Sequence, residues 1–514
     1  MDKIVTTPLY YVNDKPHLGS AYTTLATDCL ARYYRLEGHN VAFITGVDEH
    51  GLKIQKTAEL KGYDPQFHCN VVSKEFSNLW NKYHISNDRF IRTTSSNHIN
   101  NVNKFFELVK KSGDIKLAKQ QGWYCIGCEE FKDIDITNKN PVCSIHKCNL
   151  EWQDEENLFF CLSKYQDRIE ELIDKDNFIL PVARKNEIRN FVKNGLRDFS
   201  ISRINLQWGI PVPGFEGHTF YVWFDALVGY LTAILEHNSL SDISEITKCG
   251  WPRATHIIGK DILRFHAVYW PAMLISAGFD PPECVFGHGF LTREGQKMGK
   301  SLGNVLDPLN LLNVCGEDRI RWYLLKDISF GQDGDFQQQR LIDIVNNDLA
   351  NTIGNLLNRT TSMSRKWFDN KTPILSDKTL NNNRLRDNCI STSINVRKHI
   401  SNLRFSEASK SIMDLAIEAN SYINESEPWS KIKTEDQHDA VKFLIYDTLE
   451  TIRIIGILLK PFVPIYSKNL LSQLGLLESI DTWESQLNWG LLPEGYSLPT
   501  PKPLISRLEL DKSL

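Results

Sequence analysis

The chain of 514 residues is too long for one hydrophobic core and predicts roughly two to four domains. Its apolar content of 41%, charged content of 24% and net charge of −4 are ordinary for a globular protein and exclude an overall basic coat for nucleic acid. The absence of an apolar run of about 18 residues excludes a transmembrane helix. Eleven unevenly spaced cysteines and no apolar signal segment predict a reducing compartment, the cytoplasm.

The first 51 residues predict a strand, a helix and a second strand. "KIVTTPLYYVN" (3–13) is rich in β-branched and aromatic residues, as buried strands are. Residues 20–38 have helical spacing and end at Gly38, a typical helix stop. "NVAFITGVDEHG" (40–51) is a second buried strand that ends in a charged turn. This order predicts a parallel βαβ unit, the building block of a Rossmann-type α/β sheet.

The α/β pattern is interrupted and then resumes. Residues 122–160 hold clustered cysteines and little periodicity, which indicates an inserted module. Residues 255–278 again predict a strand, a turn and a helix, and residues 284–293 predict one further strand. The sequence therefore predicts one α/β domain that is split by an insertion.

The C-terminal third predicts a helical bundle. No glycine occurs from 355 to 455, and residues 440–464 predict a strong amphipathic helix. Over 351–410 we count 11 Lys and Arg against 4 Asp and Glu, an excess of +7. This charge indicates either a solvated helix face or a face that binds a polyanion such as RNA.

The inserted module contains a metal-binding pattern. Cys125-x2-Cys128 is followed, after 14 residues, by Cys143-x2-His146. Two such pairs suit tetrahedral zinc in a closed, structural Cys3His site, whereas the alternative is a chance cluster of thiols. Cys148 is a spare thiol, because the x2 spacing of His146 repeats the first pair. We therefore expect one structural zinc ion.

Two corners of the α/β domain are candidates for ligand binding. "PHLGS" (16–20) joins the first strand to the first helix, where free N–H groups, His17 and Gly19 can meet a phosphate. Asp48 follows the second strand, at the strand ends where such sheets bind ligands, and can receive an ammonium group. The alternatives are an ordinary helix start and a solvated turn.

The run "GQKMGKSLGN" (295–304) resembles the end of a phosphate-binding P-loop. The opening glycine of that motif is missing, because residue 294 is Glu. A P-loop also continues into a long helix, whereas Gly303 and Pro308 follow here. This argues against a P-loop kinase or ATPase and leaves two lysines, Lys297 and Lys300, on a loop.

Together these motifs resemble class I aminoacyl-tRNA synthetases, and among them the methionyl-tRNA synthetase family, over essentially the whole chain. "HLGS" is similar to the HIGH signature and "KMGKS" to the KMSKS signature. "GVDEHG", "WYCIGCEEF", "YVWFDAL" and "IIGKDILRFHAVYWPAML" resemble that family in the same order. Two departures are Ser20, where the signature has a second histidine, and Gly299, where it has a serine.

The resemblance implies a methionine site and an ATP site. Asp48 would hold the ammonium group of methionine with Arg203 nearby, and Trp223 and Tyr230 would be pocket walls rather than ordinary core. The full methionine set is Leu9, Tyr11, Asp48, Arg203, Trp223, Ala226, Tyr230, Ile262 and His266. ATP would meet His17, Gly19, Ser20, Gly259, Asp261, Lys297 and Lys300, of which His17, Lys297 and Lys300 would be catalytic.

The resemblance also implies RNA recognition in the bundle. Asn355 and Arg359 share a helix face, and Trp429 follows a proline. By position alone these three are ordinary surface residues. The resemblance implies that they contact the anticodon of tRNA(Met). The implied parts are a Rossmann domain (1–117 and 226–294) with a zinc insertion (118–225), a KMSKS and connecting domain (295–350), an anticodon-binding domain (351–485) and a tail (486–514).

The expected reaction joins L-methionine to tRNA(Met) with ATP and Mg²⁺, by a monomer. Two other functions fit parts of the sequence. A zinc-dependent RNA-binding protein without catalysis would leave the split nucleotide fold without a use. Class I synthetases for valine, leucine or isoleucine carry a large editing insertion, whereas this insertion spans only about 100 residues.

Overall fold

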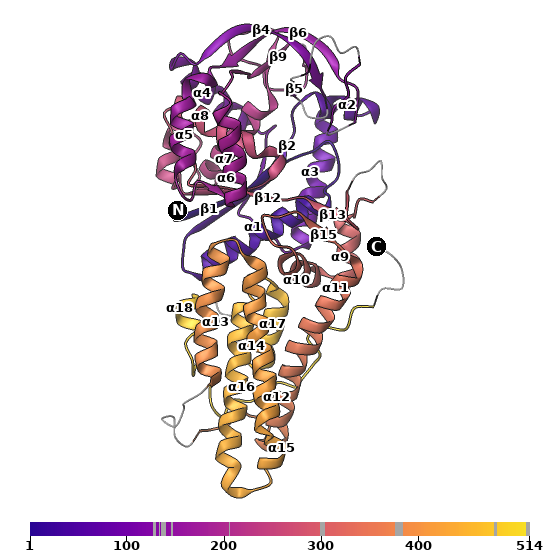
Figure 1. The fold of residues 1–514 in the computed structure, drawn as a ribbon, viewed down its shortest axis with the longest axis vertical. Helices are drawn as coiled ribbons and strands as arrows, with labels where there is room; N and C mark the ends of the chain where they lie inside the picture. The colour runs from indigo at the N-terminus through magenta and orange to yellow at the C-terminus, as the bar shows by residue number, and fades with distance from the viewer. Residues whose placement is uncertain are drawn as a thin grey trace. The chain divides into compact units, whose positions relative to one another are not determined.

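A computed structural model describes residues 1–126, 130–132, 134, 140–144, 147–204, 206–298, 304–375, 384–476 and 481–509. The chain divides into two compact units (Figure 1). Unit 1 comprises residues 1–16 and 41–288, and unit 2 comprises residues 17–40 and 289–514. Within the described ranges, no helix has the length and apolarity that a membrane crossing requires.

Unit 1 is built on a six-stranded parallel sheet with the order β3-β2-β1-β11-β12-β7. The strands are β1 (Lys3–Tyr11), β2 (Val41–Asp48), β3 (Arg89–Arg92), β7 (Ile179–Leu180), β11 (Ala254–Gly259) and β12 (Cys284–His288). The predicted α/β class is confirmed, and the strand order reverses at β1, where open α/β sheets form a binding crevice.

Helices cover this sheet. They are α2 (Leu52–Leu60), α3 (Pro65–Lys82), α4 (Ser96–Lys111), α5 (Gln166–Asp174), α6 (Val182–Lys193), α7 (Val222–His237) and α8 (Trp270–Ser276). Short helical turns are η1 (Leu162–Tyr165), η2 (Ile243–Cys249), η3 (Lys260–Ile262) and η4 (Phe265–Tyr269). Helix α7 packs against β1, β2 and β3 and is buried almost throughout, which places its residues close to the strand ends.

The strands of a smaller antiparallel sheet of order β5-β4-β6-β8 lie between β3 and β11 in the chain. Its strands are β4 (Ile115–Cys125), β5 (Glu130–Lys132), β6 (Glu151–Phe160) and β8 (Phe199–Ser200), and a separate pair is β9 (Ser202–Ile204) with β10 (His218–Phe220). The long β4–β6 ladder is largely exposed, and therefore its sequence lacks a clear apolar period.

The single strand predicted over 284–293 is in fact two strands. Residues Cys284–His288 form β12 of the large sheet, whereas β13 (Leu291–Arg293) lies between β14 (Gln296–Lys297) and β15 (Gly334–Phe336) in unit 2. The chain changes sheet at Gly289, where a Cβ atom would lie 2.3 Å from the backbone of Gln332. Only glycine allows this close approach of two backbones.

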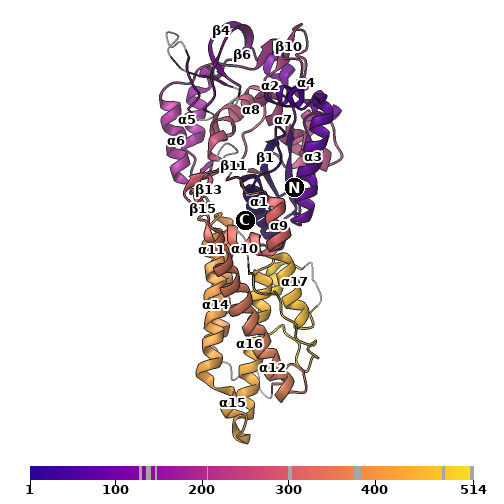
Figure 2. The ribbon, with the colours of Figure 1, turned by 90° about the vertical axis from the view of Figure 1, so that its right-hand side faces the viewer.

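Unit 2 is mainly helical, as predicted (Figure 2). Its helices are α1 (Leu18–Leu36), α9 (Pro308–Cys315), α10 (Glu317–Asp327), α11 (Gln338–Val345), η6 (Asn346–Ile353), α12 (Gly354–Trp367), α13 (Arg384–Ser401), α14 (Phe405–Ser426), α15 (Pro428–Lys431), η8 (Glu435–Gln437), α16 (His438–Leu458), α17 (Pro464–Gln473) and α18 (Trp483–Gln486). Helix α16 packs against α12, α13, α14 and α17.

The prediction that α16 is amphipathic is wrong for most of its length. Every residue from Leu444 to Leu458 is buried, because other helices surround it. The charged pair Glu450 and Arg453 is buried with it: the Arg453 Nε donates to Glu450 Oε2 at 2.8 Å. The backbone N–H groups of residues 490–492 also donate to this carboxylate, so the C-terminal segment is attached to the central helix.

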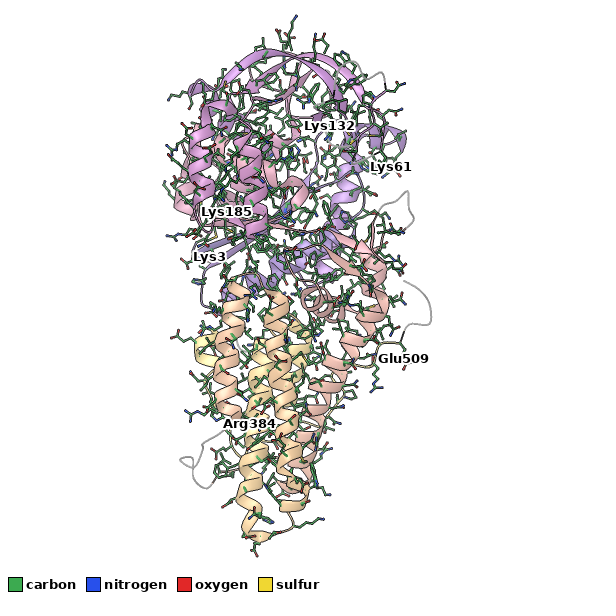
Figure 3. The ribbon with its side chains drawn as sticks, viewed as in Figure 1. Lys3, Lys61, Lys132, Lys185, Arg384 and Glu509 are labelled. Atoms are coloured by element: carbon green, nitrogen blue, oxygen red, sulfur yellow. The ribbon has the colours of Figure 1, made fainter. Side chains whose placement is uncertain are left out.

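Part of the positive charge predicted for 351–410 is neutralised inside unit 2. Arg384, labelled on α13 in Figure 3, pairs with Glu418 and with Glu425. Arg397 donates two hydrogen bonds to the Glu37 carboxylate of α1, at 2.7 and 2.5 Å. These arginines form ion pairs within unit 2. The net charge of the segment therefore overstates the positive charge that a polyanion can reach.

Candidate active site

A small hollow of about 20 Å³ lies at the carboxyl ends of β1 and β2 in unit 1. Pro8 interrupts the β1–β2 register between Thr6 and Leu9, because proline has no N–H for the ladder. Seven residues of the predicted methionine set line the hollow: Leu9, Asp48, Trp223, Ala226, Tyr230, Ile262 and His266. Two further lining residues, Pro8 and Leu227, are not in the predicted set.

The walls of this hollow are apolar or neutral. The Trp223 ring stacks on Phe265 with centroids 4.0 Å apart. Burial lowers the pKa of His266 to about 4, so its imidazole is neutral at pH 7. Its Nδ1 lies 3.2 Å from the Ile262 carbonyl, which can only accept, so the ring hydrogen is on Nδ1. Its Nε2 therefore accepts the hydrogen of the Tyr230 hydroxyl at 2.9 Å. These walls suit an uncharged, polarizable side chain.

Asp48 is the carboxylate of the hollow. It is the last residue of β2 and is 6% exposed, so little water competes for it. Trp208 fixes the turn that follows, because its Nε1 donates to the Glu49 carbonyl at 2.5 Å and its own carbonyl accepts the Gly51 N–H at 3.1 Å. A fixed, shielded carboxylate at the mouth of a neutral hollow can hold an ammonium group.

Two members of the predicted methionine set are not among the described residues that line the hollow. Tyr11 is the Cα partner of Asp48 across the β1–β2 ladder, and Lys53 lies over its ring at 5.8 Å. Arg203 is on β9, where its guanidinium lies 4.2 Å from the Tyr221 ring and donates to Ser200 and Ser202 at 2.8 Å. Arg203 thus orders the β9–β10 region.

The predicted phosphate corner lies in unit 2, at the start of α1. His17 is the N-cap of α1, and its Nδ1 accepts the Ser20 N–H at 3.3 Å. The Ser20 hydroxyl returns to the His17 backbone, accepting its N–H at 3.1 Å and donating to its carbonyl at 2.7 Å. With Nδ1 accepting, the hydrogen of a neutral His17 ring is on Nε2, where it can be donated outward. Ser20, which departs from the signature, therefore completes a capping box.

The other predicted ATP residues are placed as follows. Gly259 ends β11, and a Cβ atom there would lie 2.6 Å from the Asp261 carboxylate, so glycine leaves room for this exposed side chain. Lys297 ends β14, opposite Thr292. Lys300 and Gly299 lie outside the described residues, as do Cys128 and His146 of the predicted zinc site.

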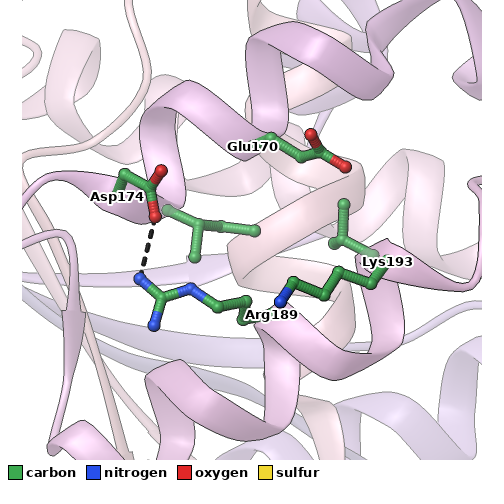
Figure 4. A pocket seen from close by; sticks show the side chains of 6 residues that line it. Glu170, Asp174, Arg189 and Lys193 are labelled. Carbon is green, nitrogen blue, oxygen red and sulfur yellow. Dashed lines mark hydrogen bonds and ion pairs between the residues drawn. The ribbon is translucent and has the colours of Figure 1, made fainter.

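A second, larger hollow lies between α5 and α6 (Figure 4). It is lined by Glu170, Ile173, Asp174, Arg189, Val192 and Lys193, two acids against two bases. Arg189 Nη2 lies 2.8 Å from Asp174 Oδ1, so this pair is already satisfied. The hollow contains none of the predicted site residues.

The described part of the cysteine cluster brings thiols together. Cys125 and Cys143 are buried, and Cys148 Sγ lies 3.9 Å from Cys125 Sγ. A tight loop joins Cys143 to Cys148, since the Cys143 N–H donates to the Cys148 carbonyl at 2.8 Å. Two thiolates on one tetrahedral zinc lie about 3.8 Å apart, so this donor set fits zinc. Among the described residues, no group of three potential ligands is assembled. The predicted ligand set does not include Cys148.

Two of the three predicted RNA-contacting residues of unit 2 meet each other. The Arg359 guanidinium of α12 lies 5.1 Å from the Trp429 ring of α15, although the two residues are 70 positions apart. Trp429 is 41% exposed, and Asn355 is exposed one turn before Arg359. A ring and a guanidinium plane on one surface can stack on unpaired bases.

Family models match nearly the whole chain. The model described as tRNA synthetases class I (M) matches residues 3–138 and 133–361. The model described as the anticodon binding domain of methionyl tRNA ligase matches residues 373–513.

Individual relatives agree with these matches. A Synechocystis methionine–tRNA ligase is 48% identical over 98% of this chain and 97% of its own length. The chloroplastic/mitochondrial methionine–tRNA ligase of Arabidopsis thaliana is 44% identical over 99% of this chain and 83% of its own. The solved structure of Mycobacterium tuberculosis methionyl-tRNA synthetase in complex with methionyl-adenylate has a TM-score of 0.92 and 35% identity, covering 98% of this chain and 99% of that one.

Proposed function

Because the chain belongs to the methionyl-tRNA synthetase family of class I, we propose that it attaches L-methionine to tRNA(Met) in two steps. In the first step the methionine carboxylate attacks the α-phosphorus of ATP, pyrophosphate leaves, and methionyl-adenylate forms. In the second step a ribose hydroxyl at the 3′ end of tRNA attacks the adenylate carbonyl, and AMP leaves. Both steps need positioning and charge stabilisation rather than a covalent enzyme intermediate.

The hollow around Asp48 is the observation that supports this substrate most directly. One shielded carboxylate at its mouth fits the ammonium group of an amino acid, while the neutral His266–Tyr230 pair and the Trp223 wall fit a thioether. A cationic or anionic side chain would meet no opposite charge at these walls.

The test is methionine-dependent exchange between ATP and pyrophosphate. We expect exchange with methionine and little with cysteine, leucine or valine, since a neighbouring class I synthetase would prefer one of these. Asp48→Asn should raise the KM for methionine about ten- to a hundredfold, which is the effect of losing a hydrogen bond to a charged group, with the KM for ATP unchanged.

Asp174→Asn, which changes an exposed carboxylate at the second hollow, is the matched control and should leave both KM values unchanged. Exchange that depends on another amino acid, or an Asp48→Asn enzyme with normal methionine affinity, would refute the assignment.

We also propose that ATP meets His17, Gly19 and Ser20 at the start of α1, and Gly259 and Asp261 after β11. Lys297 and Lys300 would add two ammonium groups to the phosphates, and His17 would donate through Nε2. Mg²⁺ bound with ATP would neutralise phosphate charge during the displacement. We further propose that the enzyme is a monomer of the cytoplasm.

In the bundle, we propose that Asn355, Arg359 and Trp429 contact the anticodon. The exposure of Asn355 and Trp429 and the Arg359–Trp429 contact support this role. Trp429→Ala should weaken tRNA(Met) binding about ten- to a hundredfold, because stacking on one base contributes about 1–3 kcal/mol. Tyr496→Ala changes another exposed aromatic of unit 2 and is the control. Pyrophosphate exchange without tRNA should be normal in both variants, and unchanged tRNA affinity in Trp429→Ala would contradict the proposal.

Finally, we propose one structural zinc ion held by Cys125, Cys128, Cys143 and His146. Metal analysis of purified protein should find one zinc per chain, and Cys143→Ser should lose it. Cys148→Ser should retain it, since Cys148 is not among these four ligands. Because the Cys148 and Cys125 thiols are 3.9 Å apart, a Cys148→Ser protein without zinc would instead assign Cys148 as a ligand.

A further inference from the structure

Asp225 is a buried carboxylate that joins two histidines from distant parts of unit 1. It lies in the first turn of α7 and has no exposed surface. One oxygen lies 2.6 Å from His50 Nδ1 and the other lies 2.6 Å from His98 Nε2. Because an ionised carboxylate only accepts hydrogen bonds, both rings donate to it.

Asp225 is ionised in the folded protein. Burial opposes its charge, but the adjacent His50 and His98 outweigh burial and hold the pKa of Asp225 at about 2. A buried carboxylate with two short hydrogen bonds has little freedom to move, so it fixes the distance between the elements that carry its partners.

Those elements carry the walls of the hollow. His50 follows Asp48 by two residues, and its N–H lies 3.5 Å from Asp48 Oδ1. Helix α7, which carries Asp225, also carries Trp223, Ala226 and Tyr230. His98, on α4, also lies 3.4 Å from Thr232 of α7 through Nδ1.

The packing beside His98 adds a direct connection to the hollow. A Cβ atom at Gly229 of α7 would lie 2.6 Å from Leu9 Cδ1 and 3.7 Å from His98 Cε1. Leu9 and the His98 imidazole therefore both lie against α7 at Gly229, so the same turn of the helix carries a wall of the hollow and a partner of Asp225.

From this arrangement we propose that His50, Asp225 and His98 act as positioning residues for methionine, holding the Asp48 turn and the first turns of α7 at one fixed spacing. The three side chains do not touch the reacting atoms. The inference rests on the proposed methionine site, and it assigns to the three residues an effect on methionine affinity that is separate from ATP binding.

The chain allows matched substitutions at both histidines. An Asn side chain places an N–H where His50 has Nδ1, and a Gln side chain places one where His98 has Nε2. The pairs His50→Ala with His50→Asn, and His98→Ala with His98→Gln, therefore compare loss and retention of each hydrogen bond at the same position. Pyrophosphate exchange gives the KM for methionine and for ATP, and thermal unfolding reports stability.

We expect His50→Ala and His98→Ala to raise the KM for methionine about ten- to a hundredfold, the effect of losing a hydrogen bond to a charged group, with the KM for ATP within about twofold of normal. His50→Asn and His98→Gln should restore most of the methionine affinity. If an alanine variant does not fold, Asp225→Asn takes its place. Its KM for methionine is then compared with that of His50→Asn or His98→Gln.

Equal changes in both KM values, or lower stability with a normal KM for methionine, would overturn the positioning role. Exchange by the unmodified enzyme that does not depend on methionine would instead refute the proposed function, so the two failures are distinguishable.

Discussion

His17→Asn is expected to slow methionyl-adenylate formation about 100- to 1000-fold, the usual effect of removing one donor that stabilises transition-state charge. In the proposed ATP site His17 would have two separate tasks. Its Nδ1 accepts the Ser20 N–H and caps α1, whereas its Nε2 would donate to a phosphate oxygen of ATP. Asn retains the first task, because its side-chain oxygen can accept the same N–H and Asn is a favoured N-cap, but its shorter side chain places no donor at the position of Nε2.

The comparison with His17→Ala separates the two tasks. Alanine removes the cap as well, so we expect it to lower stability by about 1 kcal/mol in addition to the catalytic loss. Single-turnover adenylate formation and thermal unfolding of both variants are the measurements. An Asn variant that forms adenylate at a near-normal rate would show that His17 acts only as a cap.

Asp28→Ala is expected to destabilise unit 2 by about 3–5 kcal/mol, the usual result of leaving a buried charge without its partner. Asp28 of α1 accepts hydrogen bonds from Arg32 and Arg321, each at 2.7 Å. Arg321 of α10 has no exposed surface and also donates to the Phe462 carbonyl at 2.7 Å. This cluster therefore joins the helix that begins at His17 to α10 and to the segment before α17.

The double variant Asp28→Ala/Arg321→Met also removes the fully buried guanidinium and should be more stable than Asp28→Ala alone, because only the partly exposed Arg32 then lacks its carboxylate. Urea unfolding followed by a probe in unit 2 gives the comparison. A loss below about 1 kcal/mol in the single variant would show that the Pro461 and Phe462 carbonyls and water are sufficient partners for the Arg321 guanidinium.

Several features of the fold could be predicted because they depend on residues close together in the chain. β1 and β2 are runs of β-branched and aromatic residues, α1 ends where Gly38 has a φ of +86°, and the glycine-free stretch forms helices. The positions of Asp48 and Leu9 also follow from local sequence, since parallel strands bring their carboxyl ends to one edge of the sheet.

The structure differs from the prediction, or adds to it, where distant segments decide the environment of a residue. Nothing in residues 284–293 indicates that the backbone of Gln332 packs against Gly289. At that glycine the chain passes from one sheet to another. Helix α16 has polar residues at intervals, yet neighbours on all sides bury them, and Glu450 and Arg453 satisfy each other there. The aromatic rings around the Arg203 guanidinium, those of Tyr124, Phe131 and Tyr221, likewise come from separate segments.

The sequence by itself determined the order of strands and helices, the paired cysteines and the motif residues, because backbone preference and side-chain period act over a few residues. Only the tertiary structure decided which distant groups meet: Arg359 with Trp429, Cys125 with Cys148, and Asp225 with His50 and His98. Such contacts depend on how packing closes long segments of chain, and no local pattern encodes that closure.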